Sequence, residues 1–114
     1  MKALFLILNK TEKLNEILEA YVEVGVRGAT IIDSQGMGSA LVEGNIPLLG
    51  GLLRTVMDNN RPYNKVIFAV IKEETTLNAA IASVEKILGD LDKPGAGLMF
   101  TIDVDKVIGG SYSN

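Results

Sequence analysis

The strongest constraint on the fold is an order of apolar strand, amphipathic helix and second strand that occurs twice along the chain. In the first unit, residues 2–8 form a short apolar run typical of a central strand. Residues 11–24 then place apolar side chains at three- and four-residue steps, and Gly25 stands where a helix-ending glycine belongs. Residues 29–35 are rich in β-branched side chains. This unit predicts one helix lying on two strands.

The second unit repeats the pattern, with a strand at 65–71, a helix at 75–88 and a strand at 98–104. Two such units most simply form an α+β fold, a ferredoxin-like βαββαβ sandwich with two helices on one face of an antiparallel sheet. The strands are apolar on both sides, so the uncovered face would expose a large apolar surface. We therefore expect subunits to pack through that face.

The amino-acid composition excludes several classes of function. The chain has 114 residues, 47% of them hydrophobic, which predicts one compact domain over residues 1–114. Cysteine and histidine are absent, so thiol nucleophiles, imidazole bases and the usual zinc ligands are excluded. A net charge of -3 with scattered basic residues disfavours nucleic-acid binding. The apolar run at 3–8 is too short for a membrane span or a signal peptide, which predicts a cytoplasmic protein.

Two short glycine turns are the candidate ligand contacts. Gly36-Met37-Gly38 follows one strand and Gly95-Ala96-Gly97 precedes another, so each predicts a place where backbone comes close to a ligand. A structural interpretation competes, because glycine at a strand end often serves a turn or bulge with positive φ. Side chains suited to bond-breaking chemistry are scarce near both turns, which favours sensing over catalysis.

The stretch between the two units is the least regular part of the chain. Asn45 and Pro47 suit a helix start, and a helical apolar stripe follows that Gly50-Gly51 interrupts. The stripe predicts a marginal helix and has two interpretations, burial in the core or contact with a partner. Its residues are Leu48, Leu49, Leu52, Leu53, Val56 and Met57.

Several of these segments resemble the PII-type nitrogen regulators. Residues 10–17, 24–30 and 36–38 are similar to the first half of that family in the order and spacing of elements. Residues 93–100 and 104–108 are similar to its second glycine turn and last strand. Members of the family are trimers of the ferredoxin-like unit, and they bind adenine nucleotides in clefts between subunits. The resemblance thus implies a homotrimeric regulator with a nucleotide effector and no catalytic cofactor.

The resemblance also implies roles for individual residues. Residues 39–60 correspond to the family's long variable loop, the T-loop, which docks onto transporters, enzymes or regulators, so Leu48, Leu49, Leu52 and Leu53 are candidate partner contacts. Tyr63 lies at the exit of this segment and is not assigned the family's tyrosine modification. The implied nucleotide contacts are the Thr30 hydroxyl toward the base, Gly36, Met37 and Gly38 from one subunit, and the backbone of Gly95, Ala96 and Gly97 toward phosphate with Lys93 as counter-charge.

Four positions depart from the family pattern. Where the family has a basic residue after each glycine turn, this chain has Ser39 and Leu98, and two phosphate-binding arginines are replaced by Gly109 and Ser111. Each lost charge-assisted contact is worth about 1.5 to 3 kcal/mol. These departures favour ADP, AMP or a cyclic nucleotide over tight binding of a triphosphate.

Two other functions are compatible with the sequence. One is a small oligomeric enzyme on the same sandwich, with Asp33 or Asp103 as a base of raised pKa in an apolar pocket. The other is a purely structural trimer, similar to CutA proteins. The enzyme hypothesis requires a buried carboxylate, and exposure of both aspartates would exclude it.

Overall fold

The computed structural model describes residues 1–43 and 63–110. It confirms the α+β class and both strand-helix-strand units; the element boundaries lie within two residues of those predicted, except that the first three residues of the first predicted helix form a 3-10 turn. The elements in chain order are β1 (Lys2–Leu8), the 3-10 turn η1 (Thr11–Lys13), α1 (Leu14–Val24), β2 (Thr30–Gln35), α2 (Met37–Glu43), β3 (Tyr63–Ile71), α4 (Glu74–Leu88) and β4 (Leu98–Asp103).

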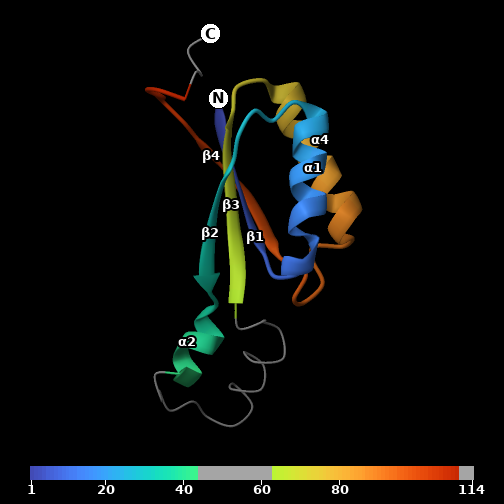
Figure 1. Cartoon of the computed structure of the whole chain (residues 1–114), viewed down its shortest axis with the longest axis vertical. Coiled ribbons are helices and arrows are strands. Elements are labelled where there is room, and N and C mark those ends of the chain that lie inside the picture. The colour runs from blue at the N-terminus through green and yellow to red at the C-terminus, as the bar shows by residue number, and fades with distance from the viewer. Residues whose placement is uncertain (44–62, 111–114) are drawn as a thin grey trace.

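The four strands form one antiparallel sheet in the order β2-β3-β1-β4. The first and third strands are central, and β2 and β4 are the two edges. Helices α1 and α4 run side by side across one face of this sheet (Figure 1). The arrangement is the ferredoxin-like sandwich expected for two joined strand-helix-strand units.

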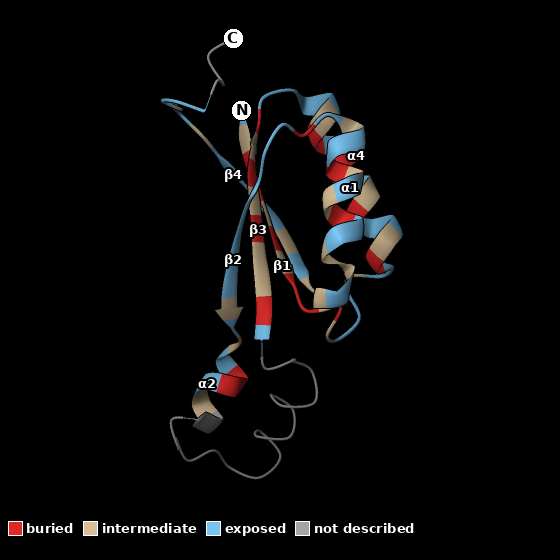
Figure 2. Cartoon of the chain, viewed as in Figure 1, coloured by how far each residue is buried: buried red, intermediate tan, exposed pale blue. Residues whose placement is uncertain are grey.

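The core lies between this sheet face and the two helices. Leu4, Leu6 and Leu8 alternate along β1 toward the helices and are fully buried (Figure 2). Ile17 from α1 and Val84 from α4 meet them and are also fully buried. Each such burial stabilises the fold by roughly 1.5 to 3 kcal/mol. Gly25 ends α1 with φ 98°, as the sequence predicts, because a left-handed C-cap favours glycine.

The opposite face of the sheet, which we call the open face, has no helix over it in the described residues. Phe68, Phe5 and Phe100 lie opposite one another on β3, β1 and β4, and their rings stack with centroids 5.3 and 5.1 Å apart. Leu98 and Ile102 flank this row on β4 and remain 59% and 48% exposed. The uncovered apolar face expected from the sequence is therefore present.

The segment after β2 differs from the expected turn. Gly36 and Gly38 do not have positive φ, and helix α2 begins at Met37, with the Ala40 N–H donating to the Gly36 carbonyl at 3.0 Å. The strand therefore leads directly into a helix, not into a flexible turn. Residues 39–43 of the variable segment are helical, whereas the apolar stripe with Leu48, Leu49, Leu52 and Leu53 lies outside the described residues.

No helix within residues 1–43 and 63–110 has the length and apolarity needed to cross a membrane.

The buried Tyr21 hydroxyl allows a test of how the core contributes to stability. Its side chain is 2% exposed, its hydroxyl has no hydrogen-bond partner among the described residues, and burial raises its pKa to about 12. Replacing an unpartnered buried hydroxyl removes a desolvation penalty of about 1 to 3 kcal/mol. We expect Tyr21→Phe to be at least as stable as wild type in urea unfolding at pH 7.

The same residue predicts a pH dependence. The folded pKa lies above the ordinary value of 10, so below pH 10 Tyr21 is neutral in both the folded and the unfolded chain and its ionisation costs no stability. As the pH rises from 10 toward 12, the unfolded chain loses the proton first, and the free energy of unfolding falls by up to roughly 2 to 3 kcal/mol. Urea unfolding across this range should show a weaker alkaline loss in Tyr21→Phe than in wild type or in the matched variant of exposed Tyr63, Tyr63→Phe. Equal loss in all three proteins would contradict this assignment.

Candidate functional site

The two glycine segments lie at the same end of the sheet but on opposite edges. Strand β2 ends where β4 begins, because β2 runs parallel to β1 whereas β4 runs antiparallel to it. Gly36–Gly38 therefore follows one edge strand, and Gly95–Gly97 precedes the other (Figure 1). Strands β3 and β1 separate them, a distance of about 14 Å at the usual spacing of 4.7 to 4.9 Å per strand. One small ligand does not bridge both segments of the same chain.

In the first segment, Gly38 and Ser39 are buried, whereas the Met37 side chain is 72% exposed. The Ser39 hydroxyl accepts a hydrogen bond from the Gln35 amide at 3.2 Å. The position that carries a basic residue in the PII pattern is thus a small neutral side chain tied to the end of β2. This segment offers an exposed Met37 and no positive charge of its own.

The second segment is ordered by its own hydrogen bonds. The Lys93 N–H donates to the Asp90 carbonyl and the Ala96 N–H donates to the Lys93 carbonyl, both at 3.2 Å. The Ala96 amide is therefore engaged within the turn, and Ala96 is buried. Lys93 is exposed, as a counter-charge for a ligand must be.

Gly97 has a structural reason to be glycine. Its φ is 127°, and a Cβ at this position would lie 2.8 Å from the backbone carbonyl oxygen of Ile7. Close approach to β1 thus accounts for Gly97 without a ligand. Gly95 has φ 76°, so it also occupies a conformation that side chains rarely adopt.

Thr30 begins β2 opposite Phe68 and is exposed on the open face. Gly36 is six positions further along the chain, which is about 20 Å of strand at 3.3 Å per residue. Thr30 and the first glycine segment therefore mark the two ends of one edge strand.

The described positions that depart from the family pattern carry no cation, whether at this end of the sheet or, for Gly109, beyond the end of β4. Leu98 starts β4 and is 59% exposed. Gly109 is exposed with φ 89°. Ser111 lies outside the described residues.

The two aspartates proposed as catalytic bases are open to solvent, which contradicts the enzyme hypothesis. The side chains of Asp33 and Asp103 are 85% and 81% exposed. Asp33 accepts a hydrogen bond from the Lys65 ammonium at 2.5 Å, and Asp103 accepts one from Lys2. The hydrogen bond and positive charge of Lys2 lower the pKa of Asp103, the opposite of the shift that a buried base requires. Each aspartate thus forms an ion pair with a lysine on the neighbouring strand.

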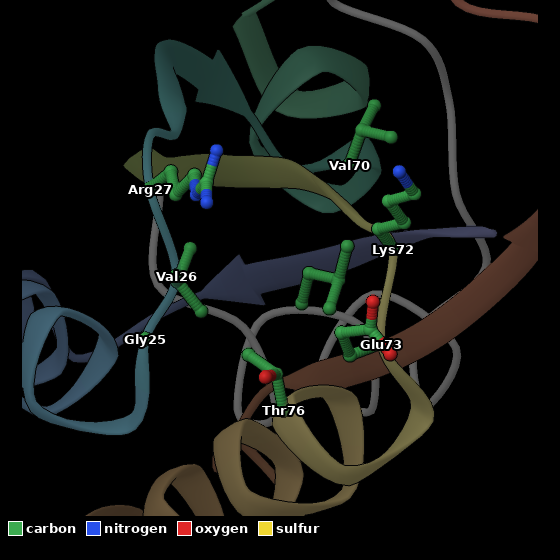
Figure 3. A pocket seen from close by; sticks show the side chains of 8 residues that line it. Gly25, Val26, Arg27, Val70, Lys72, Glu73 and Thr76 are labelled. Atoms are coloured by element: carbon green, nitrogen blue, oxygen red, sulfur yellow. The ribbon is translucent and has the colours of Figure 1, made fainter. Parts of the chain in front are cut away.

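A cavity that sequence reasoning missed lies at the other end of the sheet. The β2–β3 ladder stops at Thr30 and Phe68, but β3 continues to Ile71, so the chain diverges there. Residues 25–27 line one side of the resulting gap, and residues 70–73 with Thr76 line the other (Figure 3). The one sequence signal was Arg27, the sole arginine among the described residues.

A family model, nitrogen regulatory protein P-II, matches residues 1–110. The chain belongs to the P-II family. A search of curated proteins found no match. Membership agrees with the βαββαβ order, the helices on one sheet face and the two glycine segments, and it identifies the protein as a P-II-like regulatory protein.

Gly97 generates a test that separates structure from ligand binding. Gly97→Ala should lower the free energy of unfolding by about 2 kcal/mol without any ligand, because φ 127° and the Ile7 carbonyl both oppose a Cβ. Gly28→Ala is the matched control, since nothing lies within 4 Å of its added Cβ. Urea unfolding of both variants measures the difference. A stable Gly97→Ala variant would show that this glycine is not required by packing.

Proposed function

We propose that this P-II family protein senses an adenine nucleotide between subunits of a homotrimer and regulates a partner protein. The observation that carries the proposal is the placement of the two glycine segments at one end of the sheet, on opposite edges. A nucleotide in contact with both segments needs one edge from each of two chains. Family membership supports the regulatory role.

The open face supports assembly. Its aromatic row and the exposed Leu98 and Ile102 form an apolar surface that water solvates poorly. Covering it with the same face of neighbouring copies would bury these side chains and bring the edge strand of one chain beside that of the next. A trimer built in this way completes the nucleotide site that one chain lacks.

The charge of the site favours a weakly charged nucleotide. Ser39, Leu98 and Gly109 supply no cation, and exposed Lys93 is the charged residue assigned to the ligand. ADP, AMP or a cyclic nucleotide therefore suits this chain better than ATP. Contacts with the backbone and the shape of the site would contribute more to nucleotide binding than charged side chains do.

The variable segment 39–60 is the proposed partner contact. This segment directly follows the first glycine segment, so a ligand at Gly36–Gly38 would lie where the variable segment begins. A nucleotide that binds one arrangement of this segment more tightly would shift its population toward that arrangement. We propose a cytoplasmic transporter domain or metabolic enzyme as the partner, with Leu48, Leu49, Leu52 and Leu53 as contacts.

Nucleotide sensing predicts thermal stabilisation. ADP, AMP or a cyclic nucleotide at 100 times its Kd should stabilise the protein by roughly 2.7 kcal/mol, which raises the Tm by several degrees. Lys93→Gln should weaken binding about tenfold, because a charge-assisted contact is lost. Lys86→Gln is the matched control, since it removes an equal charge from an exposed side chain on α4.

Differential scanning fluorimetry with each nucleotide measures both effects. No shift with ADP, AMP, ATP or cyclic nucleotides would exclude nucleotide sensing, and a trimer without such a shift would favour the structural alternative.

Assembly through the open face predicts a charge-sensitive trimer. Phe100→Asp places a carboxylate in the aromatic row and should yield monomers, because an unpaired charge is costly to bury. Val22→Asp is the matched control: Val22 is 73% exposed on α1, in the other layer. Sedimentation velocity distinguishes the species. Trimers in Phe100→Asp, or monomers in wild type, would contradict assembly through this face.

A further inference from the structure

The cavity beside the start of β2 is separate from both glycine segments. It has a volume of about 100 Å³ and an apolar wall formed by Val26, Val70 and Ile71. Its polar groups are Arg27, Lys72, Glu73 and Thr76. Figure 3 shows Arg27 on the connection between α1 and β2 and Lys72 at the end of β3, on two sides of the opening.

The charges around the cavity favour an anion. The Arg27 guanidinium has no hydrogen bond or ion pair with a described residue. Arg27 and Lys72 carry two positive charges against the one carboxylate of Glu73, so the lining has a net charge of about +1 at neutral pH. A planar guanidinium presents five N–H donors, and its fork matches phosphate oxygens.

Two further groups add donors on the same side. Thr76 lines the cavity and carries a hydroxyl. Helix α4 begins at Glu74 beside it, and no side chain caps this end. The volume is several times the roughly 10 to 15 Å³ that is enough to hold one water molecule, so a phosphate group fits in this space.

We propose that this cavity is a second binding site, for a phosphate group held by Arg27 and Lys72. The Arg27 guanidinium donates to the phosphate oxygens from one side, and Lys72 neutralises them from the other. The apolar wall limits the size of the anion. The site is distinct from the nucleotide contacts on the glycine segments and lies at the opposite end of β2.

The experiment is a titration of the 15N-labelled full-length protein with inorganic phosphate at constant ionic strength, followed by NMR. The signals of the Arg27 side-chain Nε–H and of the Thr75 and Thr76 amides should shift and saturate. Arg27→Gln should weaken phosphate binding about tenfold. Arg27→Lys keeps the charge but loses the fork, so an intermediate loss is expected. Lys86→Gln, which removes a charge elsewhere on α4, should bind as wild type does.

AMP and adenosine separate the two possible sources of the phosphate. If AMP shifts the same signals and adenosine does not, the group belongs to a nucleotide, and if inorganic phosphate alone does so, the anion is free phosphate. Either result supports the site, and the second leaves it standing even if nucleotide sensing fails. Shifts that do not saturate, or equal binding by Arg27→Gln, would overturn the proposal. A nucleotide-induced Tm shift that persists in Arg27→Gln would then leave nucleotide sensing intact.

Discussion

The rest of the structure depends on a central strand that is apolar on both faces. Leu4, Leu6 and Leu8 of β1 close the core beneath α1 and α4, while Phe5 on the other face joins a stack of three aromatic rings. One helical layer covers one face, so the burial that stabilises the fold also leaves an apolar surface in the single chain. The fold and the tendency to assemble thus arise from the same strand.

The glycines illustrate how backbone geometry and ligand binding compete as explanations. Gly25 ends α1 in the left-handed region, and Gly97 permits the chain to pass close to the Ile7 carbonyl. Both glycines are accounted for by the fold alone. Gly36 and Gly38 have no positive φ and stand at the junction of β2 and α2. Backbone conformation therefore does not explain the glycines of the first segment.

Basic residues of the family pattern are missing from this chain. Neutral residues stand at three positions where the family pattern has basic ones: Ser39 and Leu98 at the end with the glycine segments, and Gly109 beyond the end of β4. Arg27 and Lys72 instead line a cavity at the far end. In the two proposals, the shape of the site holds a ligand at the end with the glycine segments, and positive charge holds a phosphate at the far end. Together they explain how the chain can keep the family fold without the basic residues of the family pattern.

Hydrophobic periodicity located the strands and helices α1 and α4 well, because local patterning and the helix-ending Gly25 agree with the fold. It failed at Met37, where glycine suggested a turn but the chain continues into a helix. The sequence also suggested Asp33 and Asp103 equally as candidate catalytic bases. Their pairing with Lys65 and Lys2 depends on strand register, which no local pattern specifies.

By itself, the sequence determined the class of fold, the order of its elements and the absence of thiol and imidazole chemistry, since these follow from composition and local periodicity. Only the tertiary structure decided that the two glycine segments lie on opposite edges of the sheet. It also decided that Arg27 and Lys72, 45 residues apart along the chain, line one cavity. Both outcomes depend on strand order and on where the β2–β3 ladder stops, and those are set by contacts between residues far apart in sequence.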